Sequence, residues 1–278
     1  MKSDIDPVGL EDYYLEYINK KNEENYKKRY VGKENYYHAS GAGFCSRKLY
    51  YQTVEQAKPT NETPSLGKMK MRFGSIFHDD FQSSLSDTYI KTNNINTNYI
   101  NTNNINTNIC SKEKDKVLYK KKVKFHVEQE IIIPDLKVRG FYDVVAEECE
   151  GGARVYLYDL KTIASYPWTR KFGRVQYDAS ENYKLQLGTY GIAVEEQFGR
   201  LDGMYLFFYN KDTSQTKNVA VSNSYIRLAK NYWRNILREH SKGVPQFIKG
   251  ISPAEKWACG YCEFKDHCNP PDYNNKKR

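Results

Sequence analysis

Gly140-Phe-Tyr-Asp-Val-Val-Ala146 and Arg154-Val-Tyr-Leu-Tyr-Asp-Leu-Lys161, joined through Gly151-Gly152, are the two runs that decide the fold of this chain. Both runs are rich in valine, tyrosine or phenylalanine, the residues that strands favour. A Gly-Gly pair is typical of the tight turn between two neighbouring strands. The stretch therefore predicts an antiparallel strand pair.

Three polar side chains of this strand pair are candidates for chemistry. Because side chains alternate along a strand, Asp159 and Lys161 share one face and Leu160 lies on the other. Antiparallel pairing brings Asp143 beside Asp159, and two such carboxylates tolerate each other when a hard divalent cation lies between them. With the lysine holding a water or stabilising negative charge, the set suits metal-assisted hydrolysis of a phosphodiester. A hairpin with ordinary surface charges is the alternative, because Asp-x-Lys is a common sequence.

The composition favours a globular protein with a polyanionic partner. The 278 residues carry a formal net charge of +9 and include 25 tyrosines. A basic surface suggests nucleic acid first and an anionic membrane second, while a basic protein without such a partner stays open. No apolar run approaches the length of a membrane span. The start does not resemble a signal peptide, so we expect a cytoplasmic, reducing location.

Apolar periodicity predicts helices over residues 10–30, 67–88, 181–199 and 222–240, with strands near 123–128, 201–209 and 216–221. His78 lies on the second helix, and a single histidine is more often structural than a ligand unless it converges on the aspartates. Gln186 and Tyr190 lie one turn apart on the third helix, so they can act on one object together. The residues around Tyr166 and Pro167 read as a loop. An Asn-rich repeat marks residues 89–112 as a flexible insertion.

The cysteines near the end of the chain have ligand spacing. Cys259 and Cys262 are separated by two residues, and Cys268 follows after five more. Such a tight first pair can chelate one centre from a single turn. The tail supplies three cysteines, so a fourth ligand must come from elsewhere, and Cys45 is the best candidate. Buried structural thiols are the alternative.

Taken in order, these motifs resemble those of a known nuclease family. The glycine, histidine, aspartate, lysine, glutamine and tyrosine positions follow the motif series of RecB-type nucleases of the PD-(D/E)xK superfamily. One cysteine before this core and three after it resemble the iron–sulfur nucleases of that group, which include the AddB nuclease domain and Cas-four. The resemblance covers roughly residues 38–268 and rests on Gly74 with His78, Gly140 with Asp143, Asp159 with Lys161, Gln186 with Tyr190, and the four cysteines.

The resemblance implies a fold and a division of the chain. The fold is a restriction-endonuclease-like α/β core, in which helices flank a mixed central sheet and the terminal segments are clasped together. Residues 1–66 would form a helical segment with the first cluster cysteine, residues 67–250 the nuclease core, and residues 251–278 the cysteine segment. Asp159 stands where many relatives have glutamate.

The resemblance also implies a role for each motif residue. Asp143 and Asp159 would ligate Mg²⁺ or Mn²⁺, with His78 as a further ligand and the Leu160 carbonyl completing the inner shell. Lys161 would position or activate the attacking water. The remaining residues would orient the scissile strand or hold a [4Fe–4S] cluster, with Zn²⁺ in the same thiolate site as the rival: Gln186 and Tyr190 for the strand, and Cys45, Cys259, Cys262 and Cys268 for the cluster.

The function implied is a metal-dependent DNA nuclease, expected to be an exonuclease on single strands or free ends. Its setting would be recombination, repair, replication or CRISPR adaptation, with a helicase or integrase as a candidate partner and the oligomeric state open. No glycine-rich phosphate loop ends in Gly-Lys-Ser or Gly-Lys-Thr, which favours a stand-alone nuclease over a helicase fusion. The alternatives are a DNA-binding accessory protein with a structural cluster and an RNA-processing nuclease.

Overall fold

The computed structural model describes residues 10–30, 32, 35–61, 63–86, 123–148, 153–174, 180–246 and 259–268. This part of the chain contains one mixed sheet of six strands: β1 (Tyr37–His38), β2 (Val123–Ile133), β3 (Val138–Glu148), β4 (Val155–Ile163), β5 (Gly203–Asn210) and β6 (Thr216–Val221). The main helices are α1 (Leu10–Tyr30), α2 (Ser46–Leu49), α3 (Ser65–Ser86), α4 (Ser165–Phe172), α5 (Glu181–Phe198), α6 (Ser224–His240) and α8 (Lys265–Cys268). Short helical turns are η1 (Ala39–Gly41), η2 (Tyr50–Val54) and η3 (Pro134–Leu136).

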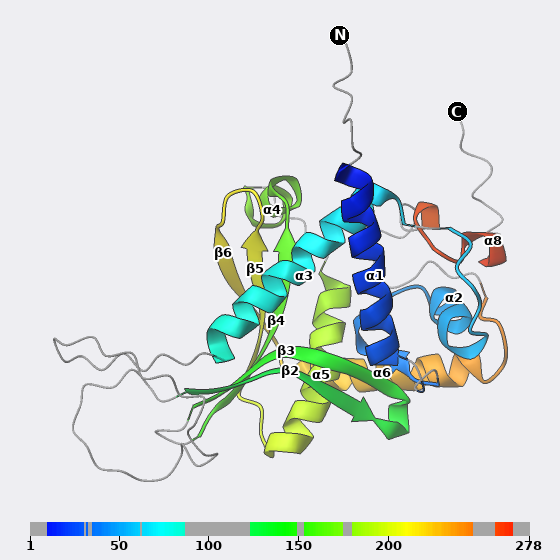
Figure 1. Cartoon of the computed structure of the whole chain (residues 1–278). Coiled ribbons are helices and arrows are strands. Elements are labelled where there is room, and N and C mark those ends of the chain that lie inside the picture. Colours follow the sequence, from blue (N-terminus) through cyan, green and yellow to red (C-terminus); the bar gives the residue numbers. More distant parts are fainter. Residues whose placement is uncertain are drawn as a thin grey trace, which may run out of the picture.

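The strand order is β1-β3-β4-β5-β6, and β2 pairs with the other edge of β3. The pairs β3–β4 and β5–β6 are antiparallel, whereas β4 and β5 run parallel. A parallel neighbour needs a crossover, and α4 and α5 provide it between β4 and β5. The expected α/β fold with a mixed sheet between helices is therefore confirmed (Figure 1).

The core lies between the sheet and the pair α5–α6. Trp233 is fully buried on α6, and its Nε1 donates a hydrogen bond to Thr189 Oγ1 at 2.9 Å. The two helices cross closely because Gly188 has no side chain, and a Cβ there would lie 2.3 Å from the carbonyl oxygen of Tyr225. On the opposite face α3 packs its aromatic side chains against β5, with the ring of Phe77 stacked on Tyr209 at 4.3 Å.

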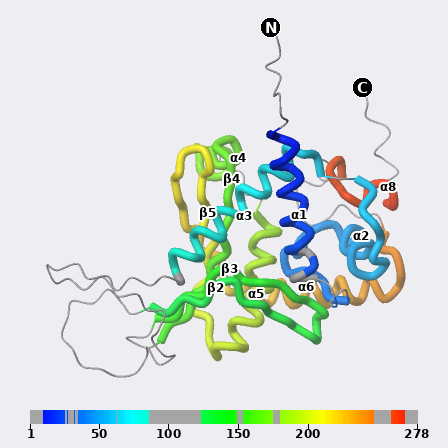
Figure 2. The backbone as a smooth tube through the Cα atoms, in the orientation of Figure 1, coloured from blue at the N-terminus to red at the C-terminus, as the bar shows by residue number. Residues whose placement is uncertain are grey.

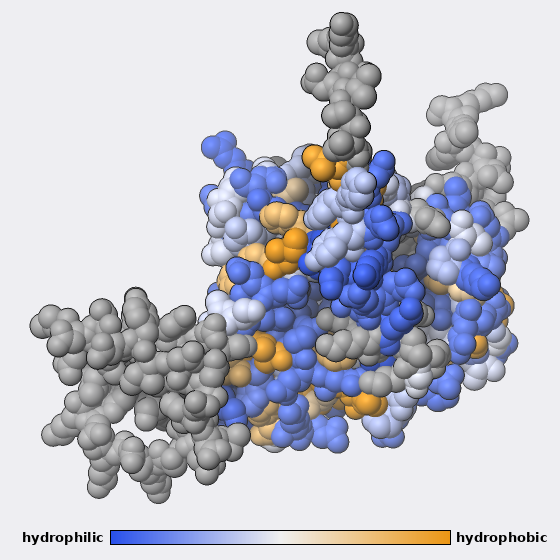
Figure 3. Space-filling model, viewed as in Figure 1, coloured by the Kyte–Doolittle hydropathy of each residue, from blue (hydrophilic) through white to orange (hydrophobic). Residues whose placement is uncertain are grey.

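Three sequence expectations need correction. The helix over 10–30 is present, but its predicted apolar face is buried only in part. Ile18 is buried and Tyr13 is 69% exposed, because little of the sheet lies under α1. On α3, Phe73 is 50% exposed, and Figure 3 shows apolar side chains open to solvent over this helix. The expected loop around Pro167 is the helix α4, since proline is tolerated in a first helical turn.

Some expectations fall on residues outside the described ranges. These are the Asn-rich insertion at 89–112, the Gly151-Gly152 turn, and residues 251–258 of the cysteine segment. In the part of the chain that is described, no helix is both long and apolar enough to cross a membrane.

Segments from the two ends of the chain pack together in a second, smaller apolar cluster. Tyr50 and Tyr51 of η2 bury Phe264, and Cys262 and Cys268 pack against the same group. Backbone contacts reinforce it, since Thr60 N donates to the carbonyl of Glu263 at 2.8 Å. The α2–η2 segment and α8 therefore lie side by side, as Figure 2 also shows. The expected contact between the two terminal segments is therefore present.

Candidate active site

Two aspartates lie where strands β3 and β4 separate. The last register pair before the separation is Val144 with Tyr158, and Asp143 and Asp159 follow it on the two strands. Asp143 is 8% exposed and Asp159 is 1% exposed. The backbone N–H of Leu160 donates to Asp143 Oδ2 at 2.7 Å. This hydrogen bond joins the two strands where their backbone pairing ends. The predicted approach of the two carboxylate-bearing strands is therefore present.

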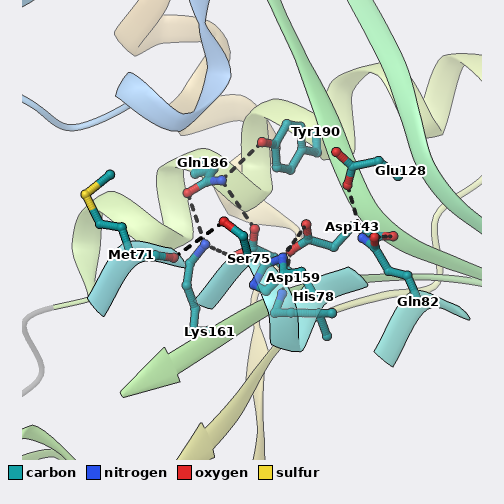
Figure 4. A network of polar contacts seen from close by, with 11 residues as sticks. Met71, Ser75, His78, Gln82, Glu128, Asp143, Asp159, Lys161, Gln186 and Tyr190 are labelled. Atoms are coloured by element: carbon teal, nitrogen blue, oxygen red, sulfur yellow. Dashed lines mark hydrogen bonds and ion pairs between the residues drawn. The ribbon is translucent and has the colours of Figure 1, made fainter. Parts of the chain in front are cut away.

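Lys161 and the helix α5 enclose Asp159 (Figure 4). Lys161 Nζ lies 2.6 Å from Asp159 Oδ2 and 3.3 Å from Gln186 Oε1, and 4.9 Å from the centre of the Tyr183 ring. Gln186 Nε2 donates to Asp159 Oδ1 at 3.3 Å and to the Tyr190 hydroxyl at 3.1 Å. Gln186 thus connects the strand residues with Tyr190, as its spacing on the helix predicts.

Helix α3 approaches the site from the other side. His78 Nδ1 lies 3.3 Å from Asp143 Oδ1, so the histidine converges on the aspartates. Gly74 favours this approach, because a Cβ there would lie 3.2 Å from the Thr162 hydroxyl on β4, a tight contact. A single histidine was expected to be structural unless it lay near the aspartates, and His78 does lie near them.

The sequence interpretation missed three residues around this centre. Gln82 is buried on α3 and its Nε2 donates to the Asp143 carbonyl at 3.3 Å and to Glu128 Oε2 at 3.1 Å. Glu128 has a φ of 48°, a left-handed conformation that is rare for a glutamate inside a strand. The third is Tyr183, which faces Lys161. Gln82 was detectable because it follows His78 by one helical turn.

The two aspartates have different protonation behaviour. Burial opposes ionisation of Asp143, but the contact with His78, the charge of Lys161 and the Leu160 N–H outweigh it and lower its pKa. Burial dominates at Asp159, where the charge of Asp143 adds to it, and its pKa rises to about 6 although Lys161 opposes the shift.

The neighbouring carboxylates favour the protonated forms of Lys161 and His78. Burial disfavours the Lys161 ammonium, yet Asp159 and Asp143 outweigh it and raise the pKa of Lys161. Burial likewise opposes the His78 imidazolium, and the contact with Asp143 overcomes it and raises the pKa of His78. Burial first, and then the charges of Asp159 and Asp143, raise the pKa of Tyr190 well above its ordinary value, so its phenol is neutral and can donate a hydrogen bond.

The donor set suits a hard divalent cation. Asp159 Oδ2 is buried, and apart from its ionic contact with Lys161 it has no hydrogen-bond partner among the described residues. Carboxylate oxygens, a carbonyl and an imidazole are ligands that Mg²⁺ or Mn²⁺ accepts. In the present arrangement Lys161 and His78 lie against the carboxylates, and within the described ranges no three histidine, cysteine or acidic side chains are grouped closely enough to hold a metal ion. The residues therefore fit a cation in kind, and the side chains would shift to hold one.

The four motif cysteines lie near one another as free thiols. Cys45, Cys259, Cys262 and Cys268 are all partly buried. Burial raises the pKa of the Cys268 thiol, Arg47 opposes this, and the other three cysteines raise it further. Arg47 Nε is buried with no hydrogen-bond acceptor among the described residues. Four thiols beside an unsatisfied cationic donor fit an anionic thiolate centre in kind, but as placed among the described residues they are not grouped closely enough to hold a metal ion.

Comparisons with known proteins bear on the fold and the family. Residues 110–269, more than half of the chain, match the family described as the PD-(D/E)XK nuclease superfamily. Among similar solved structures, the crystal structure of SSO0001 has 15% sequence identity and a TM-score of 0.47, with coverage of 92% of this chain and 95% of that one. A proposed exonuclease from Eubacterium rectale has 13% identity and a TM-score of 0.43, with coverage of 86% and 91%. No curated protein sequence matches the chain.

Proposed function

The chain belongs to the PD-(D/E)XK nuclease superfamily, and from this premise we propose that it is a DNA nuclease that hydrolyses phosphodiester bonds with bound Mg²⁺ or Mn²⁺. Its substrates would be single strands or free DNA ends, in recombination, repair, replication or CRISPR adaptation. One observation carries the proposal: Asp143, Asp159 and Lys161 converge with His78 of α3 at the point where β3 and β4 separate.

The site residues divide into cation ligands and groups that act on the substrate. Asp143, Asp159 and His78, with the carbonyl of Leu160, would hold the cation. When bound, such a cation polarises the phosphate and lowers the pKa of a water molecule. The contact with Asp143 uses Nδ1 of His78, which leaves Nε2 as the ring nitrogen that would bind the cation.

Lys161 acts as a cation and not as a general base. Its raised pKa means that the ammonium has no lone pair for a proton at neutral pH. The ammonium can hold the attacking water in place and stabilise the negative charge that develops on the phosphoryl oxygens. Gln186 keeps Lys161 and Asp159 together, and the neutral Tyr190 phenol supports Gln186 from the next turn of α5.

The test of this proposal is a cleavage assay on defined substrates. Purified protein is incubated with Mn²⁺ or Mg²⁺ and with labelled single-stranded DNA, duplex DNA with free ends, or RNA of the same sequence. We expect cleavage of DNA that Asp159→Ala and Lys161→Ala abolish. Cleavage that persists in both variants would remove the proposed centre. DNA binding without cleavage by the wild-type protein would favour an accessory role beside a helicase or integrase partner.

The four cysteines are proposed to hold a [4Fe–4S] cluster that joins the terminal segments. The support is the mutual proximity of Cys45, Cys259, Cys262 and Cys268 and the unsatisfied Nε of Arg47. Protein purified without oxygen should be brown, with the broad visible absorbance of cysteine-ligated iron–sulfur centres. A colourless protein with one equivalent of zinc would reassign the site to Zn²⁺. Cys45→Ala is expected to lower thermal stability more than it lowers the cleavage rate of the folded fraction.

A further inference from the structure

The pairing of β2 with β3 is interrupted at one residue, Glu128, which lies opposite Asp143. The register is the same before and after this point, so Glu128 is the residue across from the aspartate. No ladder pair joins these two described residues, although the residues on both sides are paired. The flanking pairs are Val127 with Val144 and Gln129 with Tyr142.

The interruption coincides with an unusual backbone conformation. Glu128 has a φ of 48°, in the left-handed region. This region disfavours every residue with a Cβ, and glycine is the residue that adopts it freely. A non-glycine residue in a disfavoured conformation persists when its surroundings hold it there, and such residues gather at functional sites. The contacts that the Glu128 side chain makes are therefore the place to look for its role.

The Glu128 carboxylate reaches the catalytic centre through Gln82. Gln82 is buried on α3, and its Nε2 donates to Glu128 Oε2 at 3.1 Å and to the backbone carbonyl of Asp143 at 3.3 Å. Figure 4 shows Gln82 and Glu128 beside Asp143, on the other side from Lys161. One amide thus joins the two residues that face each other across the interrupted ladder.

Helix α3 therefore holds both the backbone and the side chain of Asp143. Gln82 binds the carbonyl of Asp143, and His78, one turn earlier, lies 3.3 Å from Oδ1 of the same residue. The Leu160 N–H donates to its Oδ2 at 2.7 Å. Three contacts from two neighbouring elements fix the direction in which this carboxylate points, and Glu128 fixes the amide that makes one of them.

We propose that Glu128 is a positioning residue, which acts through Gln82 to hold the Asp143 carboxylate in the direction needed to bind the cation. The inference rests on the proposed nuclease function and adds a residue that touches neither the cation nor the substrate. The left-handed backbone is the conformation in which the Glu128 side chain meets Gln82. The alternative is a purely structural contact that satisfies a buried amide. That role predicts lower stability without Glu128 and unchanged cation affinity.

The test measures Mn²⁺ binding by titration calorimetry without nucleic acid. Asp159→Ala gives the baseline for Mn²⁺ that binds elsewhere on the protein. Removal of a residue that orients a metal ligand typically weakens metal binding by at least about tenfold, and we expect a loss of about that size in Glu128→Ala. Glu128→Gln should bind Mn²⁺ nearly as well as wild type, because its amide oxygen can still accept the hydrogen bond from Gln82.

A double-mutant cycle tests whether Glu128 acts through Gln82. Gln82→Leu should weaken Mn²⁺ binding, and adding Glu128→Ala to it should cause no further loss, because the two residues share one route to Asp143. The matched control is Glu147→Ala, the same change on β3 at a carboxylate that lies beside His126. This control should bind Mn²⁺ like the wild type.

The backbone conformation has its own readout. In an ordinary strand alanine is more favourable than glycine. At a position with a φ of 48° the order reverses, so Glu128→Gly should unfold at a higher urea concentration than Glu128→Ala, while both lose Mn²⁺ affinity equally. A lower urea midpoint for the glycine variant would overturn the left-handed conformation and the positioning role that depends on it.

The remaining outcomes separate this inference from the nuclease function. Equal Mn²⁺ affinities of wild type and Glu128→Ala would overturn the inference and leave the cation site intact. A loss in Glu128→Gln as large as in Glu128→Ala would overturn it too, because the charge itself would then act on the cation. Wild-type protein that binds no Mn²⁺ would refute the cation site together with the inference. The expected order of affinities in a protein that cleaves no DNA would refute the nuclease function and leave the positioning role in place.

Discussion

At the scale of single residues, the two aspartates of the candidate site have the same chemistry and opposite pKa shifts. Asp143 is surrounded by partners, namely the Leu160 N–H, His78 and the charge of Lys161, and its pKa is lowered. Asp159 is more deeply buried, and burial together with the charge of Asp143 raises its pKa to about 6 although Lys161 lies 2.6 Å from its Oδ2. The folded protein without a cation therefore carries an unfavourable charge at Asp159 at neutral pH, which a bound cation would relieve.

Asp159→Asn should make the stability of the metal-free protein less dependent on pH between about pH 4 and about pH 6. The folded-state pKa of Asp159 is about 6 against an ordinary value of 3.8, so between these values the folded state binds more protons than the unfolded state. Stability from this group is therefore lost as pH rises through that window. At 1.36 kcal/mol per pKa unit this pH-dependent loss is at most about 3 kcal/mol. The substitution also removes the carboxylate beside the Lys161 ammonium, a cost that is present at both ends of the window.

The measurement is thermal unfolding in EDTA at about pH 4 and about pH 8, where the Tm of Asp159→Asn relative to wild type should be higher at the higher pH than at the lower. Asp202→Asn is a control, because burial does not dominate at Asp202 and Arg200 lowers its pKa. A relative Tm that does not rise with pH would contradict the assignment of a buried, disfavoured charge to Asp159.

Gln186→Leu should slow hydrolysis without unfolding the protein. Gln186 contacts Lys161, Asp159 and Tyr190, and leucine keeps its volume while removing all three polar contacts. Residues that orient catalytic groups typically contribute about 10- to 100-fold. We expect a loss of that size in kcat with Mn²⁺ saturating. Gln197→Leu, on an exposed turn of the same helix, should have wild-type kinetics. Similar rates for both variants would exclude the orienting role of Gln186.

At the scale of elements, what could be predicted follows from local periodicity. The sequences of β3 and β4 alternate clearly with a Gly-Gly pair between them, and α5 repeats apolar residues at helical spacing, so the positions of Asp143, Asp159, Gln186 and Tyr190 were predictable. Helix α4 was not, because its N-terminal N–H is capped by Asp212, which lies 47 residues away. The left-handed Glu128 was not predictable either, since its conformation accompanies contacts with α3 that the local sequence does not encode.

Gly188→Ala should destabilise the protein although alanine is the better helix former. In an open helix the substitution stabilises by about 1 kcal/mol. Here the new Cβ would lie 2.3 Å from the carbonyl oxygen of Tyr225, which is backbone and cannot rotate away, so α5 and α6 must separate. Overpacking of this kind costs about 1–3 kcal/mol. Urea unfolding should show a lower midpoint than for wild type. Glu196→Ala, on the exposed side of α5, is the control, and a higher midpoint for Gly188→Ala would refute the close helix crossing.

At the scale of the whole molecule, a buried polar chain connects the terminal segments with the core. His240, at the end of α6, receives the Tyr37 hydroxyl on its Nδ1 at 2.7 Å, and its Nε2 lies 3.1 Å from the Ser46 carbonyl. Tyr37 belongs to β1, and Ser46 follows Cys45 directly. These contacts hold the segment that follows Cys45 against α6, the helix that packs on the sheet. No local pattern reveals them, because their members lie about 200 positions apart in sequence.

The hydrogen-bonded series from Tyr37 through His240 to Ser46 and the neighbouring His38 should lower the free energy of unfolding in mild acid. Burial lowers the pKa of His38 to about 4 and also lowers that of His240, so both rings are neutral in the folded protein. The unfolded state, with a histidine pKa near 6.5, then binds more protons between about pH 6.5 and about pH 4, and stability falls as pH falls through this window. For His38 the loss amounts to about 2 kcal/mol by about pH 5.

Asp159 titrates with the opposite sign, so the prediction concerns the difference between wild type and the variants His38→Gln and His240→Gln. Unfolding midpoints in urea, measured at about pH 7.5 and about pH 5, should fall less for each variant than for wild type. His126→Gln is the control, because His126 lies on β2 beside Glu147 and takes no part in the contacts from Tyr37 to Ser46. Equal falls for wild type and both buried-histidine variants would show that these rings already carry a proton in the folded state, and the neutral hydrogen-bonded chain from Tyr37 to Ser46 would be wrong.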